Sequence, residues 1–146
     1  MENIEENIRS IKNDFFAFRN GIVADSLRKL YPAATMIYGL TVPQFVELSK
    51  KYPHDFELAD ALWKDGKSRE SRIFSFYLFP VNEIREDYVV KMLIEVMSRE
   101  EAELLAFKVL KNLPKAKDIY LTLSNQTFDN PNSQYCLEMF RKNLQM

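Results

Sequence analysis

Proline and glycine divide this sequence into segments of helical length. Six prolines and three glycines are spread along 146 residues. They leave segments of about 10–18 residues, the length of ordinary helices and long for strands. The breakers are Pro32, Pro43, Pro53, Pro80, Pro114 and Pro131, with Gly21, Gly39 and Gly66. A chain cut in this way is expected to fold as short helices joined by short turns.

Apolar residues within the segments recur at helical spacing. In the first segment they stand four and three residues apart, which places one apolar stripe on a helix that ends near Gly21. The stripe consists of Ile4, Ile8, Ile11, Phe15 and Phe18. A shorter helix is expected over residues 24–31. Segments 68–79 and 84–97 are apolar on nearly all sides, so each is predicted to lie between neighbouring helices.

Capping residues predict where the later helices begin. Ser98 and Glu101 have the spacing of a capping box, and Thr41 with Gln44 forms a similar signal. A proline in the first turn is tolerated, which suits a helix opening at Asn130-Pro131. The predicted helices cover residues 41–52, 55–66, 68–79, 84–97, 102–113, 115–124 and 130–144.

Pairs of these helices begin near Thr41, Ser68, Ser98 and Asn130, roughly 30 residues apart. A recurring helix–turn–helix unit with doubly buried helices is typical of an α-solenoid. A compact bundle is the competing interpretation, because short loops suit both. The sequence therefore predicts one all-α domain over residues 1–146, built of stacked antiparallel helix pairs.

Composition and charge restrict the possible functions. The chain is 47% hydrophobic and 28% charged, which suits a globular protein and not a disordered one. No apolar run reaches the ~18 residues that span a bilayer, and the acidic N-terminus lacks an apolar signal core. A single cysteine, Cys136, forms no internal disulfide and leaves no ligand set for structural zinc. A cytoplasmic protein without a membrane partner is expected.

Two basic clusters are the candidate binding residues. The net charge of −1 is not that of a dedicated nucleic-acid binder, so any binding depends on a local patch. Each cluster brackets a turn between helices, and successive turns of a solenoid lie along one edge. The clusters are Lys64, Lys67, Arg69 and Arg72, then Lys108, Lys111, Lys115 and Lys117. A solvated charged surface is the alternative for both, and Glu70 and Arg72 are equally suited to structural pairing.

The sequence gives little indication of a cofactor, a metal or an aromatic binding site. No phosphate loop, dinucleotide fingerprint or paired metal-ligand spacing is present, so no cofactor or metal is predicted. The only tryptophan, Trp63, shares an apolar face with Phe56 and Leu62, which favours a place in the core over base stacking.

The region from Phe15 to Pro80, about half of the chain, resembles a known family. It contains Tyr38-Gly-Leu-Thr-Val-Pro-Gln-Phe, then Leu58-Ala-Asp-Ala-Leu-Trp-Lys, and then Arg69-Glu-Ser-Arg. A Gly-x-x-x-Pro helix start, an Ala-Leu-Trp helix and a Glu-x-Arg helix opening follow one another in this order. The combination resembles the bacterial DNA alkylation repair family, whose members are HEAT-like helical repeats.

The resemblance implies an α-α superhelix with a basic concave face that holds duplex DNA. Characterised members cleave the N-glycosidic bond of alkylated bases with a Trp-Trp-Asp-type segment. The corresponding stretch begins at Ser98 and has neither tryptophan. Glu100, Glu101 and Glu103 are its candidate carboxylates, and nothing in the spacing selects one, so the catalytic residue stays unknown. The first hypothesis is therefore duplex DNA binding through the basic turns, with glycosylase activity left open. The alternative is a non-enzymatic scaffold for a protein or peptide.

Overall fold

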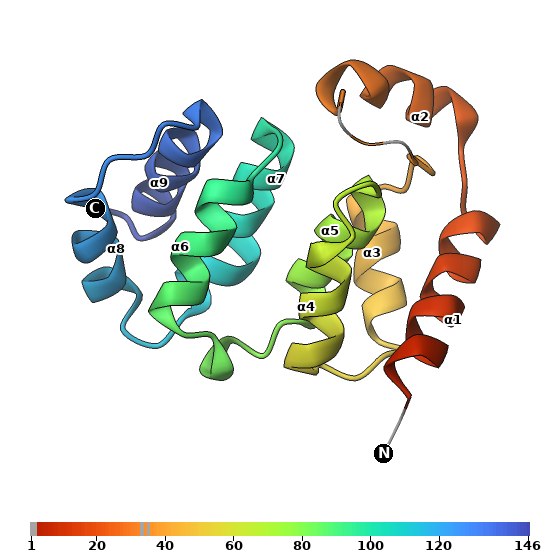
Figure 1. The fold of residues 1–146 in the computed structure, drawn as a ribbon, viewed down its shortest axis with the longest axis horizontal. Coiled ribbons are helices and arrows are strands. Elements are labelled where there is room, and N and C mark those ends of the chain that lie inside the picture. The colour runs from red at the N-terminus through yellow and green to blue at the C-terminus, as the bar shows by residue number, and fades with distance from the viewer. Residues whose placement is uncertain (1–2, 33, 35) are drawn as a thin grey trace. The chain divides into compact units, whose positions relative to one another are not determined.

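The chain is all-α. The computed structural model describes residues 3–32, 34 and 36–146, and within them it contains nine α-helices and no strand (Figure 1). The helices are α1 (Ile4–Ala17), α2 (Gly21–Leu27), α3 (Val42–Ser49), α4 (Phe56–Lys64), α5 (Arg69–Leu78), α6 (Glu86–Glu95), α7 (Arg99–Leu104), α8 (Ala116–Ser124) and α9 (Pro131–Asn143). Short 3-10 turns follow α2 (Arg28–Leu30) and α5 (Val81–Glu83). The predicted all-α class is confirmed.

The helices form two compact units, Met1–Phe79 and Pro80–Met146. The first holds α1 to α5 and the second α6 to α9. The prediction of one domain over residues 1–146 and the superhelical stacking of the helix pairs both stay predictions. Among the described residues, no helix has both the length and the apolar character needed to cross a membrane.

An aromatic cluster forms the core of the first unit. In this unit α5 packs against α3 and α4, and α1 packs against α4. Phe15 of α1 and Phe74 of α5 meet edge to face, with ring centroids 5.5 Å apart. Phe45 of α3 lies 6.1 Å from Phe74 and 5.9 Å from Tyr77. Each such pair adds about 0.5–1.5 kcal/mol beyond the burial of its area.

Burial of α5 is complete, whereas α6 is half exposed. Every residue from Arg69 to Leu78 is buried, as the apolar pattern of segment 68–79 predicted. The same prediction for segment 84–97 is wrong. Glu86 and Asp87 in the first turn of α6 and Ile94 and Glu95 in its last are exposed. Charged side chains at both ends keep part of this helix in water.

Caps confirm the helix starts predicted near residues 41, 55, 68, 98 and 130. The side chain of Ser98 accepts a hydrogen bond from the Glu101 N–H at 3.1 Å, and the Gln44 side chain accepts from the Thr41 N–H at 2.9 Å. Asp55, Ser68 and Asn130 cap their helices in the same way.

The boundary near Gly21 differs from the prediction. Helix α1 ends at Ala17, and Gly21 opens α2, which runs to Leu27. The side-chain oxygen of Asn20 accepts hydrogen bonds from the N–H groups of Ile22 and Val23 at 3.1 and 3.2 Å. Asn20 is thus a helix cap, and the second helix begins three residues before the predicted position.

Helix α9 holds the second unit together. It packs against α6, α7 and α8. The Asn130 amide donates to the carbonyl oxygens of Val96 at 2.8 Å and Ile94 at 3.2 Å, and the Ser133 hydroxyl donates to the Leu93 carbonyl. The start of α9 therefore satisfies carbonyl groups that the end of α6 leaves without helical partners.

Cys136 lies on the buried face of α9 and is expected to be chemically inert in the folded protein. It has no solvent exposure, and burial raises the pKa of its thiol above the usual range. A thiol reagent such as 5,5′-dithiobis(2-nitrobenzoate) needs an accessible thiolate. We expect no reaction over minutes at pH 8 in buffer and one equivalent of released chromophore in 8 M urea. Equal rates in both solutions would contradict this placement.

Candidate nucleic-acid interface

The first basic cluster lies mostly in the interior of its unit. Arg69 and Arg72 are only 4% and 5% exposed. The Arg72 guanidinium lies over the Trp63 ring, 3.7 Å from its centroid, and an Nη atom approaches the Trp63 carbonyl oxygen at 3.4 Å. Trp63 is itself 1% exposed, so its predicted place in the core is confirmed. These two arginines therefore hold the unit together and present almost no surface to a phosphate.

Glu70 is the centre of the buried polar contacts. It has no solvent exposure. One carboxylate oxygen accepts from the Tyr38 N–H at 2.8 Å, and the other accepts from the Gly39 N–H at 3.0 Å and from the Arg69 guanidinium at 2.5 Å. Arg69 also donates to the Leu40 carbonyl at 3.0 Å. The Arg69–Glu70 pair thus ties segment 36–40 to the first turn of α5.

The N-terminus of α5 is closed to an external anion. The Arg69 N–H donates to the Met36 carbonyl at 3.3 Å, and the Ser71 N–H donates to the Ser68 hydroxyl oxygen at 3.2 Å. The Arg72 N–H donates to the Ser68 carbonyl at 3.3 Å. Segment 36–40 and the cap therefore already satisfy the N–H groups of Arg69 and Ser71, so these two groups do not point freely toward an anion.

The two lysines of this cluster remain at the surface. Lys64 is exposed and forms an ion pair with Asp60 at 2.8 Å, one turn earlier on α4. Lys67 is exposed, and its carbonyl oxygen accepts from the Met36 N–H at 2.9 Å. The ion pair offsets the charge of Lys64, so Lys67 is the main surface cation of the four predicted residues.

The second cluster lies where one helical run ends and the next begins. Helix α7 continues as a π-helical turn (Leu105–Val109) and a 3-10 turn (Leu110–Asn112) before the chain reaches α8. From Leu104 to Lys117 the sequence has four lysines and no acidic residue. We call Lys108, Lys111, Lys115 and Lys117 the lysine turn. Lys115 and Lys117 are exposed, and Lys108 and Lys111 are half-buried.

An exposed aromatic ring belongs to this surface. Phe107 is 50% exposed, and the Lys111 ammonium lies 3.7 Å from its ring centroid. The Asn112 amide donates to the carbonyl of Lys108 at 3.1 Å, which satisfies an orphan group at the helix end. Lysines beside the negative end of a helix also stabilise it through the helix dipole.

The N-terminus of α8 is open. Its N-cap residue, Lys115, adopts a left-handed conformation with φ of 57° and makes no side-chain capping bond. The first N–H groups of a helix lack partners within it and carry partial positive charge, which suits a phosphate oxygen. Lys115 and Lys117 stand beside these groups, and Asp118 is the acidic residue of the first turn. Sequence reasoning found the lysines but not this open helix end.

The three candidate carboxylates lie in different surroundings. Glu101 is fully buried and accepts from the Met97 N–H at 2.9 Å, so it belongs to the capping of α7. Glu103 is exposed and accepts a hydrogen bond from the Tyr135 hydroxyl of α9, a contact that raises the pKa of this tyrosine. Arg99 lies over the Tyr135 ring at 4.6 Å. Glu100 is half-buried.

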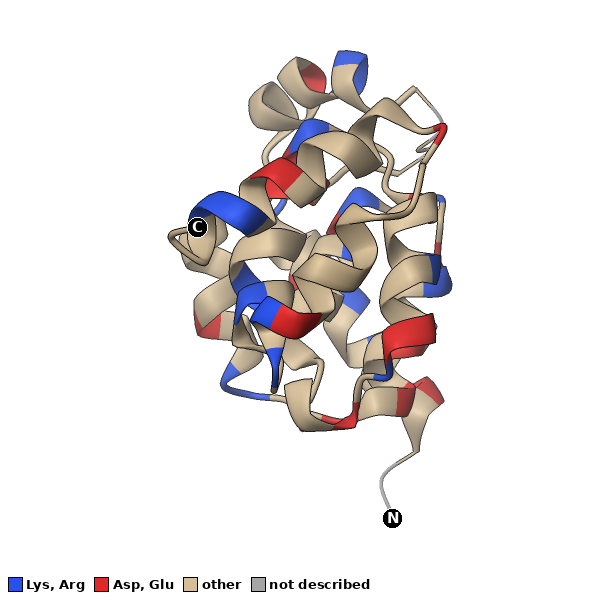
Figure 2. Ribbon diagram, turned by 90° about the vertical axis from the view of Figure 1, so that its left-hand side faces the viewer, with Lys and Arg blue, Asp and Glu red and all other residues tan. Residues whose placement is uncertain are grey.

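Charges of both signs are intermingled over the ribbons (Figure 2). No group of three or more potential metal-ligating side chains is found among the described residues. Comparisons with models of protein families, with curated proteins and with solved structures find no match.

Proposed function

We propose that this chain is a nucleic-acid-binding helical-repeat protein that contacts duplex DNA through the lysine turn. The N-terminus of α8, which has no side-chain cap and lies between two exposed lysines, carries the proposal, because uncapped N–H donors and exposed cations occur together at one point of the surface. The resemblance of residues 15–80 to the DNA alkylation repair family supports it, as does the succession of capped helix pairs. In this proposal the pairs stack as a HEAT-like superhelix.

Binding through these groups does not depend on base sequence. Lysines and helix N–H groups recognise phosphate oxygens, which fix position on a duplex without reading base edges. Because Arg69 and Arg72 are buried, the only surface cations of the first predicted cluster are Lys67 and Lys64, and Lys64 is paired with Asp60. The contact is therefore centred on residues 108–117.

The proposal covers binding and not base excision. The stretch that corresponds to the catalytic segment has one carboxylate buried as part of a cap and one held by a tyrosine. Incubation with alkylated DNA, followed by measurement of released base, tests excision separately from binding.

A salt titration of DNA binding tests the proposal. Fluorescence anisotropy of a labelled 20-base-pair duplex is expected to show binding that weakens steeply as salt rises, because each neutralised phosphate releases counterions. The double variant Lys115→Glu/Lys117→Glu is expected to weaken binding by about tenfold or more at ~50 mM salt and to flatten the log–log salt slope by about two.

Two exposed lysines of the first unit supply the matched control. Lys29→Glu/Lys50→Glu makes the same change in net charge at positions outside the lysine turn, and it is expected to retain most of the affinity. Equal losses in both double variants would show that net charge alone governs binding. An absence of binding at low salt would remove the proposal. Arg69→Glu and Arg72→Glu are unsuitable probes, because burial makes them tests of folding.

A further inference from the structure

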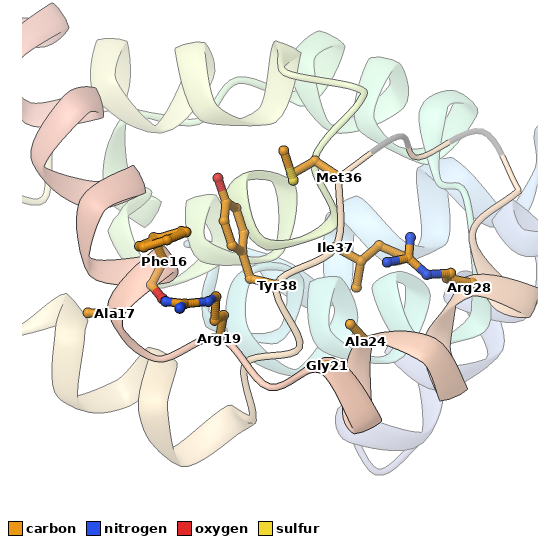
Figure 3. Close-up of a pocket in the computed structure, with 9 residues that line it drawn as sticks. All are labelled: Phe16, Ala17, Arg19, Gly21, Ala24, Arg28, Met36, Ile37 and Tyr38. Atoms are coloured by element: carbon orange, nitrogen blue, oxygen red, sulfur yellow. The ribbon is translucent and has the colours of Figure 1, made fainter.

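A groove on the first unit is lined by apolar side chains and two arginines (Figure 3). It has a volume of about 640 Å³ and lies between the end of α1, the start of α2 and the segment that leads to α3. Phe16, Met36 and Tyr38 stand together on one side, while Arg28 lies on the other beside Ile37. None of these residues belongs to the lysine turn.

The apolar side of the groove is exposed to solvent. Phe16 is 56% and Met36 49% exposed, although their neighbours Phe15 and Ile37 are buried. Gly21 and Ala24 line the groove without filling it, because they have little or no side chain. Contiguous exposed apolar side chains rimmed by polar ones mark sites of interaction with other molecules.

The apolar wall of the groove that contains Met36 and Tyr38 has its backbone fixed by hydrogen bonds. The Tyr38 N–H donates to Glu70, and the Tyr38 carbonyl accepts from the Asn20 N–H at 2.7 Å. The Arg69 N–H donates to the Met36 carbonyl at 3.3 Å. A preformed wall lowers the entropic cost of binding, since little of it must be ordered when a ligand arrives.

The charge of the groove is positive. Among the described residues that line it are Arg19 and Arg28, and none of them carries a carboxylate. Arg19 lies over the Phe16 ring at 3.8 Å and donates to the Phe16 carbonyl at 2.8 Å. A guanidinium has five N–H donors, so a carboxylate can bind without breaking that bond. Arg28 pairs with Asp25 at 3.2 Å, but both side chains are more than half exposed, and such a pair is weak.

We infer that this groove binds a segment of another protein that carries both aliphatic or aromatic residues and aspartate or glutamate. The apolar residues of the segment cover Phe16, Met36 and Tyr38, and its carboxylates reach Arg19 and Arg28. The pairing of apolar contact with opposite charge is what selects this occupant. The inference is independent of the proposed DNA contact, because the two surfaces share no residue.

Selection from a random peptide library tests the inference. A displayed library of 12-residue peptides is selected on the full chain and counter-selected on the double variant Arg19→Glu/Arg28→Glu. Both arginines are exposed, so the variant is expected to keep its circular dichroism spectrum, with at most a small decrease in melting temperature from loss of the bond between Arg19 and the Phe16 carbonyl. The expected survivors carry at least two acidic residues and one large apolar residue. Failure to enrich any peptide, or enrichment of neutral or basic ones, would overturn the inference.

Affinity measurements on the most enriched peptide locate the contact. Anisotropy of the fluorescein-labelled peptide is expected to show about tenfold weaker binding to Arg19→Glu/Arg28→Glu and to Met36→Ser. The matched control Arg9→Glu/Lys50→Glu reverses two exposed cations away from the groove and is expected to bind as the unaltered chain does. Equal binding to all variants, or displacement of the peptide by a DNA or RNA oligonucleotide at equal concentration, would contradict a peptide site in this groove.

Discussion

Replacement of Gly39 by alanine is expected to cost at least about 3 kcal/mol of folding free energy, enough to unfold a marginally stable chain. Gly39 has a φ of 91°, a backbone conformation that residues with a side chain rarely adopt. A Cβ atom at this position would lie 2.4 Å from the carbonyl oxygen of Asn20 and 2.9 Å from the nitrogen of Ala24. Both are backbone atoms, so neither can turn aside as a side chain would. Relief therefore requires α2 to move away from segment 36–40.

Urea denaturation followed by circular dichroism measures this loss. Gly66→Ala is the matched control, because a Cβ atom there meets no atom of the described residues within 4 Å. It is expected to change the stability by less than about 1 kcal/mol, with the sign favouring the folded state, since alanine restricts the unfolded chain. A Gly39→Ala variant as stable as Gly66→Ala would contradict the close approach of α2 to segment 36–40.

Helix starts could be predicted from the sequence because their causes are local. The caps at Ser68, Ser98 and Asn130 bond to groups within three residues along the chain, so the relevant residues stand together in the sequence. The same logic would have found α2, since Asn20 has the residue type of a cap. Its neighbour Gly21 suggested a turn instead, and the boundary was misplaced.

Burial could not be predicted from local sequence. Ser-Arg-Glu occurs twice, at Ser68 and at Ser98, and each serine caps its helix. Arg69 is buried, whereas Arg99 is exposed. The difference arises because segment 36–40, some thirty residues away in sequence, lies against the first turn of α5 and bonds to Glu70. Of the four basic residues predicted to form one surface cluster, two therefore lie at the surface and two are buried.

The binding surfaces were only partly predictable. The lysines of residues 108–117 are visible as a run without acidic residues. The open end of α8 depends on the left-handed backbone of Lys115, which no neighbouring glycine or asparagine signals. The predicted apolar stripe contains Phe15 and leaves out Phe16, so the exposure of Phe16 agrees with the sequence pattern, but the place of Met36 and Tyr38 beside it in the groove does not follow from that pattern. Tertiary contacts decide both features.

Replacement of Glu70 by glutamine is expected to destabilise the chain by about 3–5 kcal/mol, the cost of breaking a buried ion pair from one side. Both oxygens of the carboxylate accept N–H donors, from Tyr38, Gly39 and Arg69. Glutamine keeps the shape but replaces one acceptor by an NH₂ group, so a donor meets a donor and Arg69 loses its counter-charge. Glu57→Gln, at an exposed position in the first turn of α4, is the control and is expected to change the stability by less than about 0.5 kcal/mol. Equal urea midpoints for the two variants would contradict the central role of Glu70. Because Glu70 also fixes the backbone of Tyr38, the glutamine variant is expected to lose peptide binding at the groove in parallel with its stability.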